Sequence, residues 1–87
     1  MNSGGTYIGM TYDGCDVIWD SFSCVRLDSR LNLSNLRHSA FEIYESYLKW
    51  KPNSVNGFKI FKCSSLLDEH YHTIYEYKEE GVKWKIF

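Results

Sequence analysis

The sequence predicts an α+β fold, in which an antiparallel sheet of about five strands carries one helix packed on one face. Three observations predict this ββαβββ order. Residues 6–12 alternate between two faces as a strand does, residues 34–49 repeat apolar side chains at helical spacing, and residues 70–87 alternate again. Strands interrupted by one helix are typical of α+β domains. With 87 residues, the chain is short enough to form a single domain over residues 1–87.

The composition indicates a folded protein and argues against several classes of function. Hydrophobic residues make up 44% and aromatic residues 17% of the chain, which is too apolar for a disordered protein. The net charge of −1 lacks the basic excess of a dedicated nucleic-acid binder. The first residues do not form a signal peptide, and no apolar stretch reaches the ~18–20 residues that span a bilayer. We therefore expect a cytoplasmic protein with reduced cysteines and no membrane partner.

The first third of the chain reads as a hairpin. Residues 6–12 form the first predicted strand, and Asp13-Gly14 is a two-residue turn because both residue types tolerate a positive φ. Residues 15–27 are rich in β-branched and aromatic side chains, which favours a second strand. We expect this strand to be bulged or broken near residues 20–21.

One helix follows, from about Ser34 to Lys49. Either Ser34 or Asn32 can cap its first turn by accepting a hydrogen bond from an orphan amide. Pro52 ends the helix, because the residue before a proline avoids the α region. The apolar stripe that faces the sheet consists of Leu36, Ala40, Ile43, Tyr44, Tyr47 and Leu48.

Three further strands are predicted after the helix. The segment 56–64 holds the third strand, with a turn at Asn56-Gly57. The fourth strand runs over 70–78 and the fifth over 82–87. A two-residue turn at 80–81 separates these last two strands, and we prefer it to a three-residue turn, which would mix apolar and charged side chains on each face.

The two-residue turn sorts the last two strands into a core face and a wet face. The core face carries Tyr71, Thr73, Tyr75, Tyr77, Val82, Trp84 and Ile86. The wet face carries His70, His72, Ile74, Glu76, Lys78, Lys83, Lys85 and Phe87. A partner would bind the wet face or the acidic first hairpin, so the predicted partner-binding residues are His72, Glu76, Lys83, Lys85, Asp13 and Asp16.

The other clusters of reactive side chains fit known sites poorly. The pair His70 and His72 could bind zinc with Cys63 or Glu69, but no four-ligand spacing of a structural zinc site is present. Cys24 and His38 could act as nucleophile and base, but no third group is evident that would orient the pair. We therefore expect a non-enzymatic protein with no catalytic residue, no metal and no cofactor.

Two alternatives to protein binding stay open. Lysines and aromatic rings on the sheet could bind single-stranded nucleic acid by phosphate contact and stacking. The residues concerned are Lys49, Lys51, Lys59, Lys62, Lys83, Lys85, Trp50, Phe61 and Phe87. In the second alternative, an exposed edge strand pairs between copies of the chain, which makes the protein a homo-oligomeric structural component.

The segment YKEEGVKW, residues 77–84, and the order of predicted elements resemble one group of type I-F anti-CRISPR proteins. That group also has a hairpin, one helix and a three-stranded meander. The resemblance implies a phage protein in the host cytoplasm, a monomer or small homo-oligomer. It would inhibit a host protein or ribonucleoprotein complex by steric occlusion. No contact residue of the group maps onto this chain.

Overall fold

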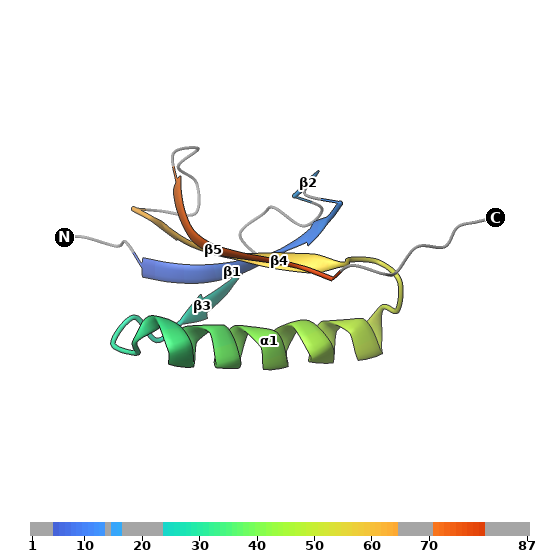
Figure 1. Ribbon diagram of the computed structural model, residues 1–87, viewed down its shortest axis with the longest axis horizontal. Helices are drawn as coiled ribbons and strands as arrows, with labels where there is room; N and C mark the ends of the chain where they lie inside the picture. The colour runs from blue at the N-terminus through green and yellow to red at the C-terminus, as the bar shows by residue number, and fades with distance from the viewer. Residues whose placement is uncertain (1–4, 14, 17–23, 65–70, 80–87) are drawn as a thin grey trace.

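An antiparallel sheet lies on one long helix in the computed structural model, which describes residues 5–13, 15–16, 24–64 and 71–79 (Figure 1). The elements are β1 (Gly5–Tyr12), β2 (Cys15–Asp16), β3 (Val25–Leu27), α1 (Leu33–Trp50), β4 (Gly57–Cys63) and β5 (Tyr71–Lys78). The helix runs along one face of the sheet (Figure 1). The predicted α+β class, with one helix against an antiparallel sheet, is confirmed for the described residues.

The described sheet contains five strands, two of which are short and share one edge, so that it is four strands wide. Its order is β2-β1-β4-β5, and β3 pairs with β1 as well. Because β2 pairs with the end of β1 and β3 with its beginning, both short strands lie along the same edge of β1. They are the two pieces of the second strand that the sequence predicts. The predicted fifth strand, 82–87, falls outside the described residues.

The helix begins one residue earlier and ends one residue later than the sequence predicts. Asn32, not Ser34, is the N-cap: its side chain accepts a hydrogen bond from the amide of Asn35 at 2.9 Å. At the other end the amide of Lys51 donates to the carbonyl of Tyr47 at 2.8 Å. The chain then turns away at Pro52, as expected for a residue that lacks an amide hydrogen.

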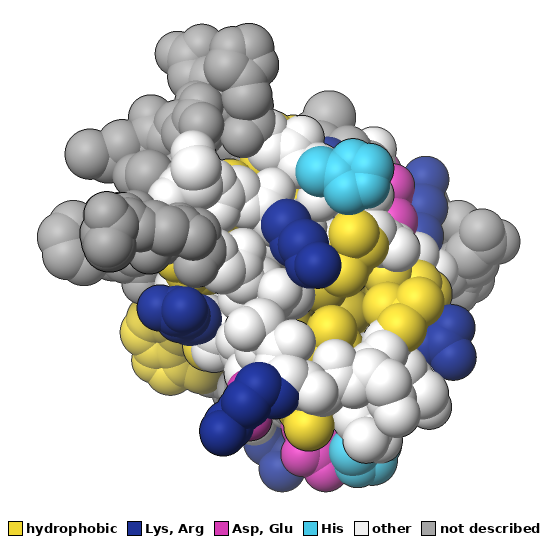
Figure 2. Space-filling model, turned by 90° about the vertical axis from the view of Figure 1, so that its left-hand side faces the viewer, with side chains coloured by type: hydrophobic (Ala, Val, Ile, Leu, Met, Phe, Trp, Pro, Cys, Tyr) yellow, Lys and Arg dark blue, Asp and Glu magenta, His cyan; other side chains and the backbone are white. Residues whose placement is uncertain are grey.

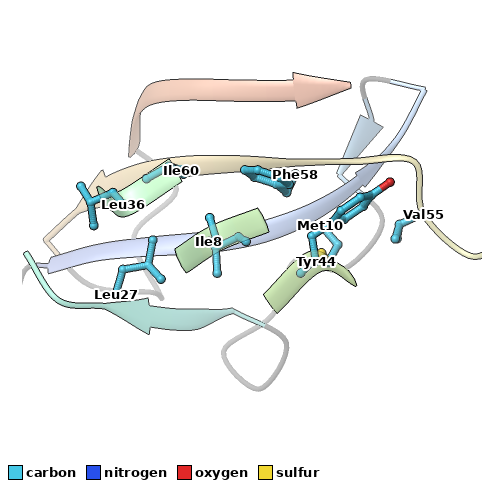
Figure 3. Close-up of a cluster of buried hydrophobic side chains, with 9 residues drawn as sticks. Ile8, Met10, Leu27, Leu36, Tyr44, Val55, Phe58 and Ile60 are labelled. Atoms are coloured by element: carbon cyan, nitrogen blue, oxygen red, sulfur yellow. The ribbon is translucent and has the colours of Figure 1, made fainter. Parts of the chain in front are cut away.

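The main core lies between α1 and the sheet. The helix contributes Leu36, Ala40 and Tyr44, and the sheet contributes Ile8, Met10, Phe58 and Ile60 (Figure 3). Leu27 and Val55 close the two ends of this cluster. The ring of Tyr77 stacks on Phe58 at 5.2 Å, so the predicted core position of that tyrosine is confirmed.

A second group of aromatic rings lies on the opposite face of the sheet. Tyr7 and Phe61 pair across β1 and β4 and alternate with the core residues Ile8 and Ile60. Their ring centroids are 5.8 Å apart, and Phe61 is only 1% exposed. The sequence predicts one wet face for the sheet. That prediction is wrong here, because outward positions of both central strands carry aromatic rings.

A bulge in β5 changes the alternation of its side chains. Ile60 pairs with Tyr75 and Phe61 with Thr73, so Ile74 is an extra residue in the register. Ile74 and Tyr75 both pack against the core on the α1 side. An extra residue of this kind bends a strand and interrupts its alternation. The prediction that Ile74 belongs to the wet face is therefore wrong.

The bulge also separates residues for which the sequence predicts a shared face. Tyr71 contacts the ring of Phe61 at 5.4 Å, on the face away from α1, whereas Tyr75 packs on the α1 side. His72 alternates with Tyr71, and Glu76 alternates with Tyr75. His72 and Glu76 therefore lie on opposite faces, which corrects the prediction that they line one wet surface.

Two turns position the end of the molecule where α1 stops. Tyr12 pairs with Cys15, so the predicted two-residue hairpin turn is confirmed, and Asp13 has a φ of 53°. The turn after α1 involves Asn53, whose φ is 64°. The sequence predicts a turn at Asn56-Gly57 instead, but Gly57 is already the first residue of β4. Asparagine tolerates the left-handed region, so either site was chemically suitable.

Candidate protein-interaction site

Trp50, at the C-terminal end of α1, is the most exposed large hydrophobic residue among those described, with 71% of its surface accessible. Tyr47 meets it edge to face, with ring centroids 5.9 Å apart. The Nζ atom of Lys51 lies 5.0 Å from the centroid of the indole ring, within cation–π range. The exposed ring of Trp50 is thus flanked by the side chains of Tyr47 and Lys51.

Trp50 is exposed because of its helical phase. The buried stripe of α1 passes through Leu36, Ala40 and Tyr44, and its next turn falls on residues 47–48. Trp50 follows that turn on the outer side. The loop behind it is fixed by the carbonyl of Lys51, which accepts a hydrogen bond from the Ser54 hydroxyl at 2.7 Å.

Asn56 links three strands at the end of the molecule where α1 stops. Its amide donates to the carbonyl of Thr11 at 2.9 Å, and its own carbonyl accepts from the amide of Glu79 at 2.7 Å. Its side-chain oxygen accepts from the amide of Asp13 at 2.8 Å, and its Nδ2 donates to the Asp13 carboxylate at 3.1 Å. The ends of β1 and β5 and the start of β4 are thereby held together.

Tyr44 reaches the same corner from inside the core. Its hydroxyl donates to Oε1 of Glu79 at 2.9 Å, and Figure 3 shows the hydroxyl oxygen directed to the side where Val55 lies. Burial, then the hydrogen bond and charge of Glu79, raise the pKa of Tyr44 well above its usual value. Burial and the same carboxylate also raise the pKa of Tyr77. The carboxylate of Glu79 therefore lies close to one buried and one partly buried tyrosine.

A small pocket of about 100 Å³ opens at this corner. It is lined by Tyr12, Tyr44, Leu48, Asn53, Val55 and Glu79, together with Asn56. Pockets for drug-sized molecules occupy about 300–1,000 Å³. This one has room only for the end of a side chain or a similarly small group. We call this pocket and the neighbouring residues Tyr47, Trp50 and Lys51 the Trp50 end.

The predicted partner-binding residues are not gathered in one place. Asp13 is exposed at the Trp50 end, where its carboxylate accepts from Asn56. Asp16 follows in β2 and pairs in register with Thr11. Lys83 and Lys85 fall outside the described residues, so their predicted role stays a prediction.

The other two predicted residues lie along β5, away from the Trp50 end. His72 is exposed and pairs in register with Lys62, and Glu76 is exposed and pairs with Lys59. Figure 2 views the end of the molecule opposite to Trp50. Hydrophobic side chains gather there beside a histidine, with lysine or arginine side chains around them (Figure 2).

Sequence reasoning grouped Trp50 with basic residues of a nucleic-acid surface and did not single out Glu79 or Asn53. The helical phase of Trp50 indicates its exposure, because the predicted apolar stripe ends at residue 48. No comparable signal pointed to Glu79. Its position depends on the bulge in β5 and on the bond from its amide to Asn56.

The part of the chain that the structure describes contains no candidate metal site and no candidate membrane-spanning helix. No group of three histidine, cysteine or acidic residues in it could hold a metal ion. His70 and Glu69, two of the residues considered as zinc ligands, are not among the described residues. None of the described helical segments has the length and apolar character of a bilayer-spanning helix.

Comparisons with protein families, with curated proteins and with solved structures find no match to this chain.

Proposed function

We propose that this chain is a non-enzymatic interaction module that binds a host protein or nucleoprotein complex and inhibits it by steric occlusion. The anti-CRISPR-like resemblance in element order motivates the inhibitor role and the host cytoplasm as its place of action. The proposed contact surface is the Trp50 end. It replaces the wet face of the last two strands, because the bulge in β5 divides that surface.

The exposure of Trp50 is the observation that carries this proposal. Burial of a tryptophan side chain contributes about 3 kcal/mol or more to an interface, and tryptophan and tyrosine are enriched among residues that dominate binding. A chain of this size has little apolar surface to spare, so leaving Trp50 in water does not stabilise the isolated molecule. A partner that covers Trp50 and Tyr47 supplies the missing burial.

The test is capture of a partner by the tagged full chain from bacterial lysate, with and without nuclease, followed by mass spectrometry. We expect a stoichiometric protein that survives nuclease and is lost with Trp50→Ala. The matched control is Leu33→Ala, which changes another exposed residue of the same helix (44% accessible) about 25 Å away along its axis. Equal capture by both variants and the unaltered chain would contradict the proposed surface.

Single-stranded nucleic acid is the second candidate partner, because Lys49 and Lys51 flank the exposed ring of Trp50. Bases stack on such rings, and lysines neutralise phosphates. The sheet itself offers less than the sequence predicts, since Phe61 is buried and unavailable for stacking. An affinity for single-stranded DNA that falls steeply with salt, together with a partner list that disappears under nuclease, would favour this candidate.

A further inference from the structure

The pocket at the Trp50 end combines a carboxylate, two tyrosines and two asparagines in a small volume. The Oε1 atom of Glu79 accepts the bond from Tyr44, which leaves its second carboxylate oxygen available. Within the described ranges, no lysine, arginine or histidine forms an ion pair with Glu79. Glu79 is also only half-exposed.

This lining has the chemistry of a site for an organic cation. A carboxylate accepts charge-assisted hydrogen bonds, and tyrosine faces attract a guanidinium or ammonium group. Tyr12, which is partly exposed, supplies the ring, and Leu48 and Val55 supply apolar contact for a methylene stem, as long cationic side chains prefer. The volume of about 100 Å³ matches the end of a side chain.

We propose that this pocket receives an arginine or lysine side chain of the protein partner, next to the contact made by Trp50. This inference rests on the proposed function for the identity of the donor, but the pocket chemistry can be tested without the partner. Glu79 is the residue that pairs with the cation. Tyr44 is a positioning residue, because its hydroxyl holds one carboxylate oxygen in place.

The probes are Nα-acetyl-arginine amide and Nα-acetyl-lysine amide, titrated into the isotope-labelled full chain and followed by amide chemical shifts. Their uncharged counterparts are the citrulline and norleucine derivatives. We expect saturable shifts at residues 12–13, 53–56 and 79 with at least one cationic probe and none with its uncharged counterpart. Citrulline binding as tightly as arginine, or shifts located elsewhere, would overturn the proposal.

Substitution of Glu79 separates charge from shape. Glu79→Gln keeps a side-chain oxygen for the Tyr44 hydroxyl and removes the charge, so we expect the dissociation constant of the probe to rise about tenfold or more. Glu76→Gln is the matched control, since Glu76 is exposed three residues earlier, in β5, and does not line the pocket. The dissociation constant of the probe for this variant should match that for the unaltered chain. Equal affinities of all three proteins would refute the assignment.

Lys83 and Lys85 of the chain itself are the competing cations. Should the probes bind only after Lys83→Gln and Lys85→Gln, the pocket would belong to the chain's own lysines and the partner assignment would be wrong. Failure of the proposed function looks different. In that case probe binding would persist while Trp50→Ala leaves capture of every protein from lysate unchanged.

Discussion

At the scale of single residues, the bond between Tyr44 and Glu79 links stability to the candidate pocket. Tyr44 is 1% exposed, and its hydroxyl reaches a carboxylate that is half-exposed. Because burial and that carboxylate raise its pKa in the folded state, the folded protein keeps this hydroxyl protonated at a pH where an unfolded tyrosine ionises. The stabilisation is therefore complete below about pH 10 and declines above it.

Tyr44→Phe tests this linkage. We expect its free energy of unfolding to lie about 1 kcal/mol below that of the unaltered chain at pH 7, because one hydrogen bond is removed. The difference should shrink as the pH rises above about 10, since only the unaltered chain gains free energy by ionising this tyrosine on unfolding. Urea denaturation of both proteins at pH 7, 9 and 11 measures it, and a difference that grows with pH would refute the sign.

At the scale of elements, the close approach of three strands explains why residue 57 is a glycine. Gly57 lies between Thr11 of β1 and Lys78 of β5 in the register. A Cβ atom there would collide with the carbonyl oxygen of Tyr77 and lie 2.9 Å from Oγ1 of Thr11. Backbone of the neighbouring strand cannot move aside cheaply.

Gly57→Ala should therefore lower the free energy of unfolding by about 1–3 kcal/mol, as overpacking does elsewhere. Gly5→Ala is its control in β1. There the nearest atom is Nε of Arg26 at 3.1 Å, at the end of a flexible side chain, so the change should stay within about 0.5 kcal/mol. Urea unfolding of the two variants decides the matter, and equal effects would show that β4 tolerates a wider spacing.

The helix and the first strand could be predicted from the sequence, whereas the N-cap and the bulge in β5 could not. Helical periodicity and Pro52 set α1 to within one residue at each end, and the alternation of residues 6–12 set β1. The choice of Asn32 over Ser34 as N-cap is a matter of one hydrogen bond between two suitable residues. The bulge at Ile74 leaves no period in the sequence, because it depends on how β5 meets β4.

At the scale of the whole molecule, strand β1 of the described sheet is buried on both faces. The predicted architecture gives α1 one face and solvent the other. Six consecutive residues of β1, from Thr6 to Thr11, are instead buried. Sequence alternation cannot distinguish a wet face from a covered one when aromatic rings occupy both sides. The candidate site could not be predicted for a similar reason, since its residues come from β1, α1, the segment between α1 and β4, and the residue after β5.

Phe61 decides between the two architectures. If the face away from α1 were wet, Phe61→Ala would change stability by about 0.5 kcal/mol or less, as surface substitutions do. Because Phe61 is 1% exposed between Tyr7 and Tyr71, we expect a loss of about 3–5 kcal/mol, comparable with Phe58→Ala in the main core.

Such a loss approaches the total stability of a small domain, so Phe61→Leu provides a milder variant, with an expected cost below about 1.5 kcal/mol and a fold that remains measurable. Lys62→Ala, at the adjacent exposed position, controls for substitution in β4 itself and should be nearly neutral. Urea denaturation at low temperature compares the series. If Phe61→Ala proved as stable as Lys62→Ala, the only core of the described residues would be the one between α1 and the sheet. The opposite face of the sheet would then be open to a partner along its whole length.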